Sequence, residues 1–338
     1  MNYFLLLLFV GCVVADFTYR YQTAYPDPPY IEFFIGKDNQ PFKAQLDFNR
    51  PYSWVFSTNC RGSRCTMNPH QHVYDPKVAG GTPTKDRFDD EDYNGYNLFK
   101  GVYANNVIRV GNLEYPIAIG LVTSGEGITF FAPDGVLGLG YDERKRSIIT
   151  RIMRDLSVKQ LTVQQGHYFL PRPVNQSLNS AGAYTFGRYS DGKCGPFTFY
   201  DTRYDGEWQF VADVRIGSTE YKNQTIGFLP GRMSEIPIPI LDAHFPFDAE
   251  TQEEYPDISL LIGSKEYKVA KEDYTMYDPE DKKKYSSLLG FSYSAYNYKF
   301  GFGSEFLQHY CVALKYDDKL EKTKIGLAEN LESPRRRK

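Results

Sequence analysis

Two aspartates each end a short apolar run and could act together on a peptide bond. The first run is 45–47, which ends in Asp47, and the second is 239–242, which ends in Asp242. Two carboxylates that share one proton do not both ionise easily, so one pKa rises and the other falls. The ionised carboxylate can then take a proton from water, while the protonated one polarises the carbonyl under attack. Asp47 and Asp242 are candidates for such a pair, and two unrelated aspartates at strand ends are the alternative.

The elements that must position these aspartates are predicted to be strands. The chain contains 28 Tyr and 24 Phe, residue types that favour strands. Short apolar and aromatic runs recur between Gly, Pro, Asn and Asp, among them 30–35, 52–56, 209–214 and 258–262. Only 148–156 has apolar residues at helical spacing, and a shorter helical turn is expected at 304–309. The pattern predicts an all-β protein with few short helices.

The two halves of the chain resemble each other weakly. Each has an apolar strand that ends in aspartate and a later segment of apolar residues and glycines, 134–140 in the first half and 300–304 in the second. Such internal repetition predicts two β lobes related by a pseudo-two-fold axis. We assign 16–196 to the N-terminal lobe and 197–331 to the C-terminal lobe.

Motifs along nearly the whole chain resemble, in order, those of the pepsin-like aspartic proteases. They are Leu46-Asp47 with Trp54-Val55 (first catalytic loop), 132–140 ("APFDGILGLA"), 207–209 ("YWQ"), Leu241-Asp242 (second catalytic strand), 303–310 ("GDVFLRQYY") and 324–328 ("KVGLA"). The resemblance implies the bilobal pepsin-like fold with Asp47 and Asp242 as its catalytic aspartates. It also implies a flap hairpin at 93–101, with Tyr93 as the substrate-binding tyrosine. Tyr96 is the alternative if the hairpin register differs, and an exposed Tyr-rich loop is the other interpretation.

The residues around both aspartates depart from the family pattern. The family has Asp-Thr-Gly-Ser/Thr at each loop, whereas this chain has Phe48-Asn49-Arg50 after Asp47 and Ala243-His244-Phe245 after Asp242. The hydroxyls that orient the carboxylates and the glycines that permit close packing are all replaced. An arginine beside the pair would also oppose the sharing of one proton.

The family's basic inhibitory prosegment has no counterpart in 16–29, unless the gene model has lost an exon. We interpret the chain as a catalytically impaired homologue that binds a peptide or protein in its interlobe cleft. The alternative is an active aspartic endopeptidase, and a purely structural or inhibitor-like role is a third hypothesis. The sequence leaves open whether the chain is an enzyme.

The N-terminus predicts entry into the secretory pathway. Residues 1–15 contain an apolar run followed by small residues, the pattern of a signal peptide, although a buried N-terminal strand is the alternative. We expect a protein of the extracellular space or the endolysosomal lumen, with no membrane span. Asn175 and Asn223 head N-glycosylation sequons.

Four cysteines remain after the signal peptide. Cys60 and Cys65 enclose four residues and are expected to form a local disulfide, which the family also has. Cys194 and Cys311 form either a second disulfide or two buried thiols.

Other functional classes find little support. The formal net charge of −3 gives no broad field for nucleic acid. The basic end of 332–338 is expected to be a disordered tail, with a processing or docking signal as the alternative. We expect no metal and no cofactor, because His70 and His72 fit a surface loop and a site of Asp47, Asp242 and His244 is a remote alternative. We expect a monomer.

Overall fold

The computed structural model describes residues 17–24, 30–49, 52–66, 72–91, 97–111, 113–127, 134–140, 153, 155–166, 179–204, 208–278, 284–292, 298–319 and 321–333. The predicted signal peptide, Tyr93, Tyr96, Arg50 and Asn175 lie outside these residues, as does most of the helix predicted at 148–156. Within the described part of the chain, no helix is long and apolar enough to cross a membrane.

The N-terminal half forms a seven-stranded sheet in the order β2-β3-β8-β4-β7-β6-β5. Its strands are β2 (Tyr30–Ile35), β3 (Gln40–Asp47), β4 (Trp54–Arg61), β5 (Thr82–Glu91), β6 (Asn97–Val110), β7 (Leu113–Gly127) and β8 (Gly135–Gly138). Two short helices, α1 (Ser63–Thr66) and α2 (Pro76–Ala79), lie beside it. In β3, buried Phe42, Ala44 and Leu46 alternate with more exposed residues, so one face of the strand joins the core.

The C-terminal half repeats this plan with a sheet in the order β17-β16-β12-β13-β21-β14-β20. Its strands are β12 (Phe210–Ile216), β13 (Thr219–Phe228), β14 (Glu235–Pro237), β16 (Ile258–Ile262), β17 (Lys265–Val269), β20 (Gly290–Ser292) and β21 (Phe300–Phe302). The short helices are α4 (Ile238–His244), η1 (Gln252–Glu254), α5 (Lys271–Tyr274) and α6 (Ser304–Leu307). A small sheet contains β15 (Asp248–Ala249), β18 (Thr275–Asp278) and β19 (Lys284–Ser287).

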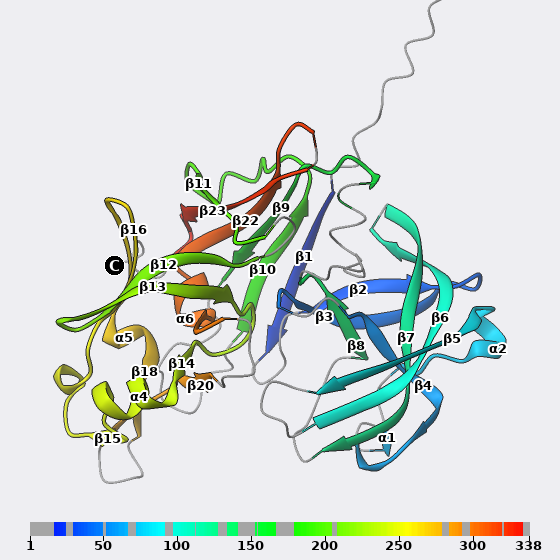
Figure 1. Cartoon of the computed structure of the whole chain (residues 1–338), viewed down its shortest axis with the longest axis horizontal. Coiled ribbons are helices and arrows are strands. Elements are labelled where there is room, and N and C mark those ends of the chain that lie inside the picture. Colours follow the sequence, from blue (N-terminus) through cyan, green and yellow to red (C-terminus); the bar gives the residue numbers. More distant parts are fainter. Residues whose placement is uncertain are drawn as a thin grey trace, which may run out of the picture.

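A six-stranded sheet joins the two halves, in the order β1-β10-β9-β22-β23-β11. Its strands are β1 (Phe17–Ala24), β9 (Gln160–Gln165), β10 (Asn179–Phe186), β11 (Thr198–Asp201), β22 (Tyr310–Tyr316) and β23 (Thr323–Glu329). Figure 1 shows blue β1 beside green β10, with β22 and β23 on the side of the C-terminal lobe. The predicted all-β, bilobal fold with few short helices is confirmed.

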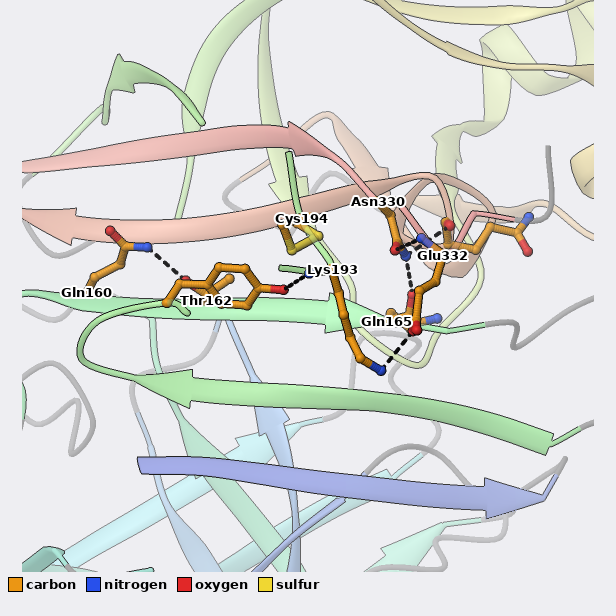
Figure 2. The surroundings of a disulfide bond; sticks show 10 residues. Gln160, Thr162, Gln165, Lys193, Cys194, Asn330 and Glu332 are labelled. Atoms are coloured by element: carbon orange, nitrogen blue, oxygen red, sulfur yellow. Dashed lines mark hydrogen bonds and ion pairs between the residues drawn. A yellow bond between two sulfur atoms is a disulfide. The ribbon is translucent and has the colours of Figure 1, made fainter. Parts of the chain in front are cut away.

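Both disulfides are present. Cys60 bonds to Cys65, as predicted, and Cys194 bonds to Cys311, which decides between the two alternatives for that pair. The second disulfide connects the segment before β11 to β22, across a sequence separation of 117 residues. Beside it, the Lys193 ammonium lies 2.9 Å from the Glu332 carboxylate (Figure 2).

Two sequence-based expectations are wrong. The run that ends in Asp242 is helix α4 and not a strand, because Pro239 lies in its first turn and cannot donate a sheet hydrogen bond. The predicted tail also begins too early. Ser333 is 4% exposed and its hydroxyl lies 2.6 Å from His309 Nδ1, so this residue belongs to the folded protein.

Candidate functional site

Asp47 is the last residue of β3, where the strand reaches the region between the lobes. β3 pairs in parallel with β8, so that Asp47 lies opposite Gly138, and the Leu139 amide donates to the Asp47 carbonyl at 2.7 Å. The Asn49 amide donates to Asp47 Oδ1 at 2.9 Å, which turns the chain sharply after the strand. The sheet register and this turn together fix the position of the Asp47 carboxylate.

The second lobe contains the same arrangement, but its strand is β13. β13 pairs in parallel with β21, with Phe228 opposite Phe302, and the Leu229 amide donates to the Phe302 carbonyl at 3.0 Å. Continuing the β13–β21 register by one residue places Leu229 opposite Gly303, just as Asp47 lies opposite Gly138. A Cβ on Gly303 would lie 2.3 Å from the Arg232 carbonyl oxygen, so the chain after Leu229 passes very close to this glycine. Leu229 therefore holds the position related to Asp47 by the pseudo-symmetry of the fold.

A small pocket lies between these two strand ends. It is lined by Gln45, Leu46, Asp47, Phe48, Asn49, Phe228, Leu229, Pro230 and Arg232. One lobe contributes Asp47, and the other contributes apolar Leu229 and Pro230 with Arg232. Its cavity volume is about 10 Å³, about the space that one water molecule needs, so the pocket is a small notch between the lobes and not a preformed ligand cavity.

The residues after Asp47 make contacts between the lobes. The Phe48 ring is 1% exposed and stacks on Trp208, with ring centroids 4.2 Å apart. The Asn49 side-chain amide donates to the Phe228 carbonyl at 3.2 Å, and its oxygen accepts from Gln209 Nε2 at 3.4 Å. At these two positions the family has a threonine and a glycine. Here the same positions connect the lobes through a buried aromatic stack and an amide.

A buried charge cluster supports the opposite wall. Arg232 Nη2 donates to Glu235 Oε1 at 2.5 Å, and the Tyr298 hydroxyl donates to Glu235 Oε2 at 2.8 Å. Burial raises the pKa of Glu235 above its usual range, and the charge of Asp47 raises it further, whereas Arg232 and Tyr298 act in the opposite direction. Arg232 is thus held beside the pocket by a carboxyl group that is itself buried.

The second predicted aspartate, Asp242, does not line this pocket. Asp242 is on the exposed side of α4, and α4 contributes no residue to the pocket at Asp47. His244 Nε2 lies 2.6 Å from the Tyr221 hydroxyl, and buried Phe245 packs edge-on against Tyr274. Asp242 and its neighbours therefore do not line the pocket at Asp47.

Sequence reasoning missed Leu229, Arg232 and Glu235. One signal was present in the sequence. The short apolar segment 226–228 is followed by Leu229-Pro230-Gly231, and Gly231 corresponds to the glycine of the family's Asp-Thr-Gly loop. The apolar run that ends in Asp242 resembled the second catalytic strand, but it forms α4. Among the described residues, no group of three or more His, Cys, Asp or Glu could hold a metal ion.

Comparison with known proteins gives a family match. The sequence model of eukaryotic aspartyl proteases matches residues 30–236, a span that includes Asp47 and Leu229 and ends before α4. The chain is 23% identical to a vacuolar aspartic protease of Candida albicans over 269 residues, which are 73% of this chain and 63% of that protein. It therefore spans slightly less than two thirds of that relative.

Two animal proteins are similar to the same degree. Renin of Canis lupus familiaris is 23% identical over 288 residues, which cover 76% of this chain and 68% of renin. Cathepsin D of the same species is 23% identical over 280 residues, which cover 73% of this chain and 67% of cathepsin D.

Proposed function

Because the chain belongs to the eukaryotic aspartyl protease family, we propose that it is a secreted or lumenal member that binds a peptide or protein segment between its lobes without cutting it. The main support is the position of Leu229. Aspartic proteolysis requires a second carboxyl group that shares a proton with the first. A leucine side chain can neither ionise nor form a hydrogen bond, so the position related to Asp47 by symmetry offers no second carboxyl group.

Binding is the function that this site could retain. Phe48 and Asn49 keep the two lobes in contact, and the pocket offers both charged and apolar walls. An extended segment would lie across this notch and contact its charged and apolar residues from outside. We propose that the ligand is peptidic, that Asp47 contacts it, and that Tyr93 covers it from the flap.

A secretory route is consistent with the covalent features of the chain. Disulfides persist in oxidising compartments, and two are present. Asn223 is exposed on β13 and has a left-handed backbone conformation with φ of 52°, so a transferase could reach its side chain. We propose that 1–15 is cleaved as a signal peptide and that Asn175 and Asn223 carry glycans.

One observation favours an active endopeptidase as a second candidate. Glu235 is a buried carboxyl group with a raised pKa, and it is close enough to Asp47 for their charges to interact. An unusual Asp47–Glu235 pair could share a proton. Both Glu235 oxygens already accept hydrogen bonds from Arg232 and Tyr298, which makes Glu235 a poor acid for a substrate. Loss of any proteolysis in Glu235→Gln, with binding unchanged, would favour this candidate.

Capture of a defined peptide library tests the proposal. Glycosylated protein from a secretory host would be immobilised and incubated with the library at pH 4.5 and pH 7, and the bound peptides would be identified by mass spectrometry. We expect a selected set of intact peptides that is lost when Leu229→Trp fills the pocket and kept in Asp242→Asn. Equal capture by the wild type and Leu229→Trp would contradict the proposal, as would recovery of the peptides as fragments.

A further inference from the structure

The carboxyl group of Glu305 is fully buried in helix α6 and takes no part in the site described above. Its Oε2 accepts two hydrogen bonds from one residue, the Ser234 amide at 2.8 Å and the Ser234 hydroxyl at 2.7 Å. Its Oε1 is buried and has no hydrogen bond to another residue in the described part of the chain, where the nearest donor besides Ser234 is the backbone amide of Glu305 itself. Glu305 therefore holds the segment 229–235, which carries Leu229 and Arg232, from the side opposite the pocket.

Three more buried polar atoms, on α6 and on β9 that packs against it, lack a partner within the described part of the chain. They are Ser304 Oγ, Gln308 Oε1 and Gln165 Nε2. Ser304 precedes Glu305 directly, and Gln308 follows it by three residues, the spacing at which side chains on a helix are neighbours. Gln165 comes from β9 and accepts from the Gly231 amide at 3.0 Å. Figure 2 shows Gln165 next to Asn330, whose side-chain amide donates to the Gln165 carbonyl at 2.7 Å.

The protonation state of Glu305 changes this balance. An ionised carboxylate only accepts hydrogen bonds, and a full charge at so buried a site is costly unless a cation compensates it. A protonated Oε1 becomes a donor, and the side-chain oxygen Oε1 of Gln308 is an unpartnered acceptor on the same helical turn. Protonation leaves Oε2 free to keep both hydrogen bonds from Ser234. The protonated form thus keeps these contacts and avoids a buried charge.

Among the described residues of the elements that pack against α6, no cation compensates the charge of Glu305. Asp273 of α5 is the nearby charge that acts on it, and Asp273 pairs with His309 at 2.8 Å. β9 and β21 carry no charged residue, and Lys315 of β22 lies over the Phe199 ring. The charged residues of β17 and of segment 229–235 pair elsewhere: Lys265 with Thr198, Glu266 with Arg215, Lys268 with Asp257, and Arg232 with Glu235.

We propose that Glu305 is a proton-binding site that holds segment 229–235 firmly when it is protonated and loosens that segment when it ionises. The wall of the pocket opposite Asp47 would then respond to pH, so that it is ordered in acidic compartments and looser at neutral pH. This inference does not depend on the identity of any ligand or on whether the chain cuts peptides.

The direction of the effect follows from the pKa. Burial raises the pKa of Glu305 from 4.5 to about 7, hydrogen bonds from its own backbone amide and from Ser234 lower it, and the nearby charge of Asp273 raises it again. A folded-state pKa above the unfolded value means that the folded protein binds the proton more tightly. The stabilisation is therefore complete below pH 4.5 and is lost as the pH rises through about 7.

Thermal unfolding from pH 4 to pH 8 tests this inference. In Glu305→Gln the amide oxygen can accept from Ser234 and the NH₂ group mimics the protonated oxygen. We expect the variant to match the wild type at pH 4 and to melt higher by about 3 °C or more at pH 8. Glu253→Gln removes an exposed carboxylate and is the matched control, with a melting curve that follows the wild type at every pH. A difference between Glu305→Gln and the wild type that is constant with pH would overturn the proposal.

Hydrogen exchange provides a second readout that needs no variant. After correction for intrinsic exchange rates, the amides of 229–235 in the wild type should be less protected at pH 7.5 than at pH 5. The same change should be absent from the β3 amides and from 229–235 in Glu305→Gln. Equal protection of 229–235 at both pH values would rule out the switch. If the change persists in Glu305→Gln, it belongs to another group, and the proposal is wrong.

Discussion

The two side chains after Asp47 show how single residues alter a conserved loop without disrupting the fold. Phe48 and Asn49 stand where the family has threonine and glycine, and sequence reasoning treated them only as losses. The structure shows what they contribute, because Phe48 stacks on Trp208 and Asn49 bonds across to Phe228. Sequence alone could not reveal these contacts, since the partners lie more than 150 residues away along the chain.

Phe48→Ala should destabilise the protein strongly. The ring is buried at the junction of the lobes, and Phe→Ala in a core costs about 3–5 kcal/mol in the free energy of unfolding. Phe247→Ala is the matched control, because that ring is 92% exposed and its loss should change stability by less than about 0.5 kcal/mol. Chemical denaturation measures both. Similar losses for the two variants would show that the Phe48 stack contributes little.

Asp47 and Asp242 should respond differently to the same substitution. Asp47→Asn removes the charge that lines the pocket, so we expect at least about a tenfold loss of affinity for captured peptides, equivalent to about 1.4 kcal/mol. Asp242→Asn changes an exposed residue of α4 and should leave both affinity and melting temperature unchanged. Titration calorimetry with one captured peptide checks both. A large loss of affinity in Asp242→Asn would restore that residue to the site.

At the scale of elements, the sequence predicts where the strands lie better than it predicts which strands pair and which residues lie opposite each other. Alternating burial in β3 and the glycine-rich run at β8 were evident from local sequence. Helix α4 was misassigned, because 239–242 contains an apolar run and an aspartate that fit the expected motif. The correct counterpart of β3 is β13, which emerges only from its parallel pairing with β21. A parallel pair joins segments far apart in sequence, so local patterns carry no information about which residue faces which.

Gly135 is required for the position of β3 and hence of Asp47. A Cβ at Gly135 would lie 2.1 Å from the Trp54 carbonyl oxygen, and neither backbone can move without disturbing the β3–β8–β4 pairing. We expect Gly135→Ala to cost about 1–3 kcal/mol or more in the free energy of unfolding. A Cβ at Gly195 would meet only ordinary contacts at 3.6 Å and beyond, so Gly195→Ala should be tolerated. Equal tolerance in denaturant melts would contradict the packing argument.

At the scale of the whole molecule, the ordered series of motifs was enough to predict two β lobes. The six-stranded sheet that joins the halves was not predicted, because its strands come from both ends and the middle of the chain. The disulfide at Cys194 and Cys311 lies beside this sheet and was one of two alternatives. The fold therefore follows from the sequence better than the site does, since the site depends on how two distant loops meet.

The two disulfides should contribute unequally to stability. Cross-linking the unfolded chain costs it more entropy when the enclosed loop is longer, and the sequence separations are 117 and 5 residues. We expect the double variant Cys194→Ala/Cys311→Ala to lose about 2–5 kcal/mol in the free energy of unfolding. The double variant Cys60→Ala/Cys65→Ala should lose less in the same denaturation assay. The reverse order would show that local geometry around 60–65 outweighs chain entropy.

The central claim is that Leu229 stands at the position related by symmetry to Asp47, where the family has its second catalytic aspartate. The most direct measurement is cleavage of a broad peptide library by purified protein between about pH 3 and pH 7, with products identified by mass spectrometry and an active aspartic protease as positive control. The account predicts no more cleavage by the wild type than by Asp47→Asn at any pH. Cleavage that disappears in Asp47→Asn and persists in Leu229→Ala would contradict it.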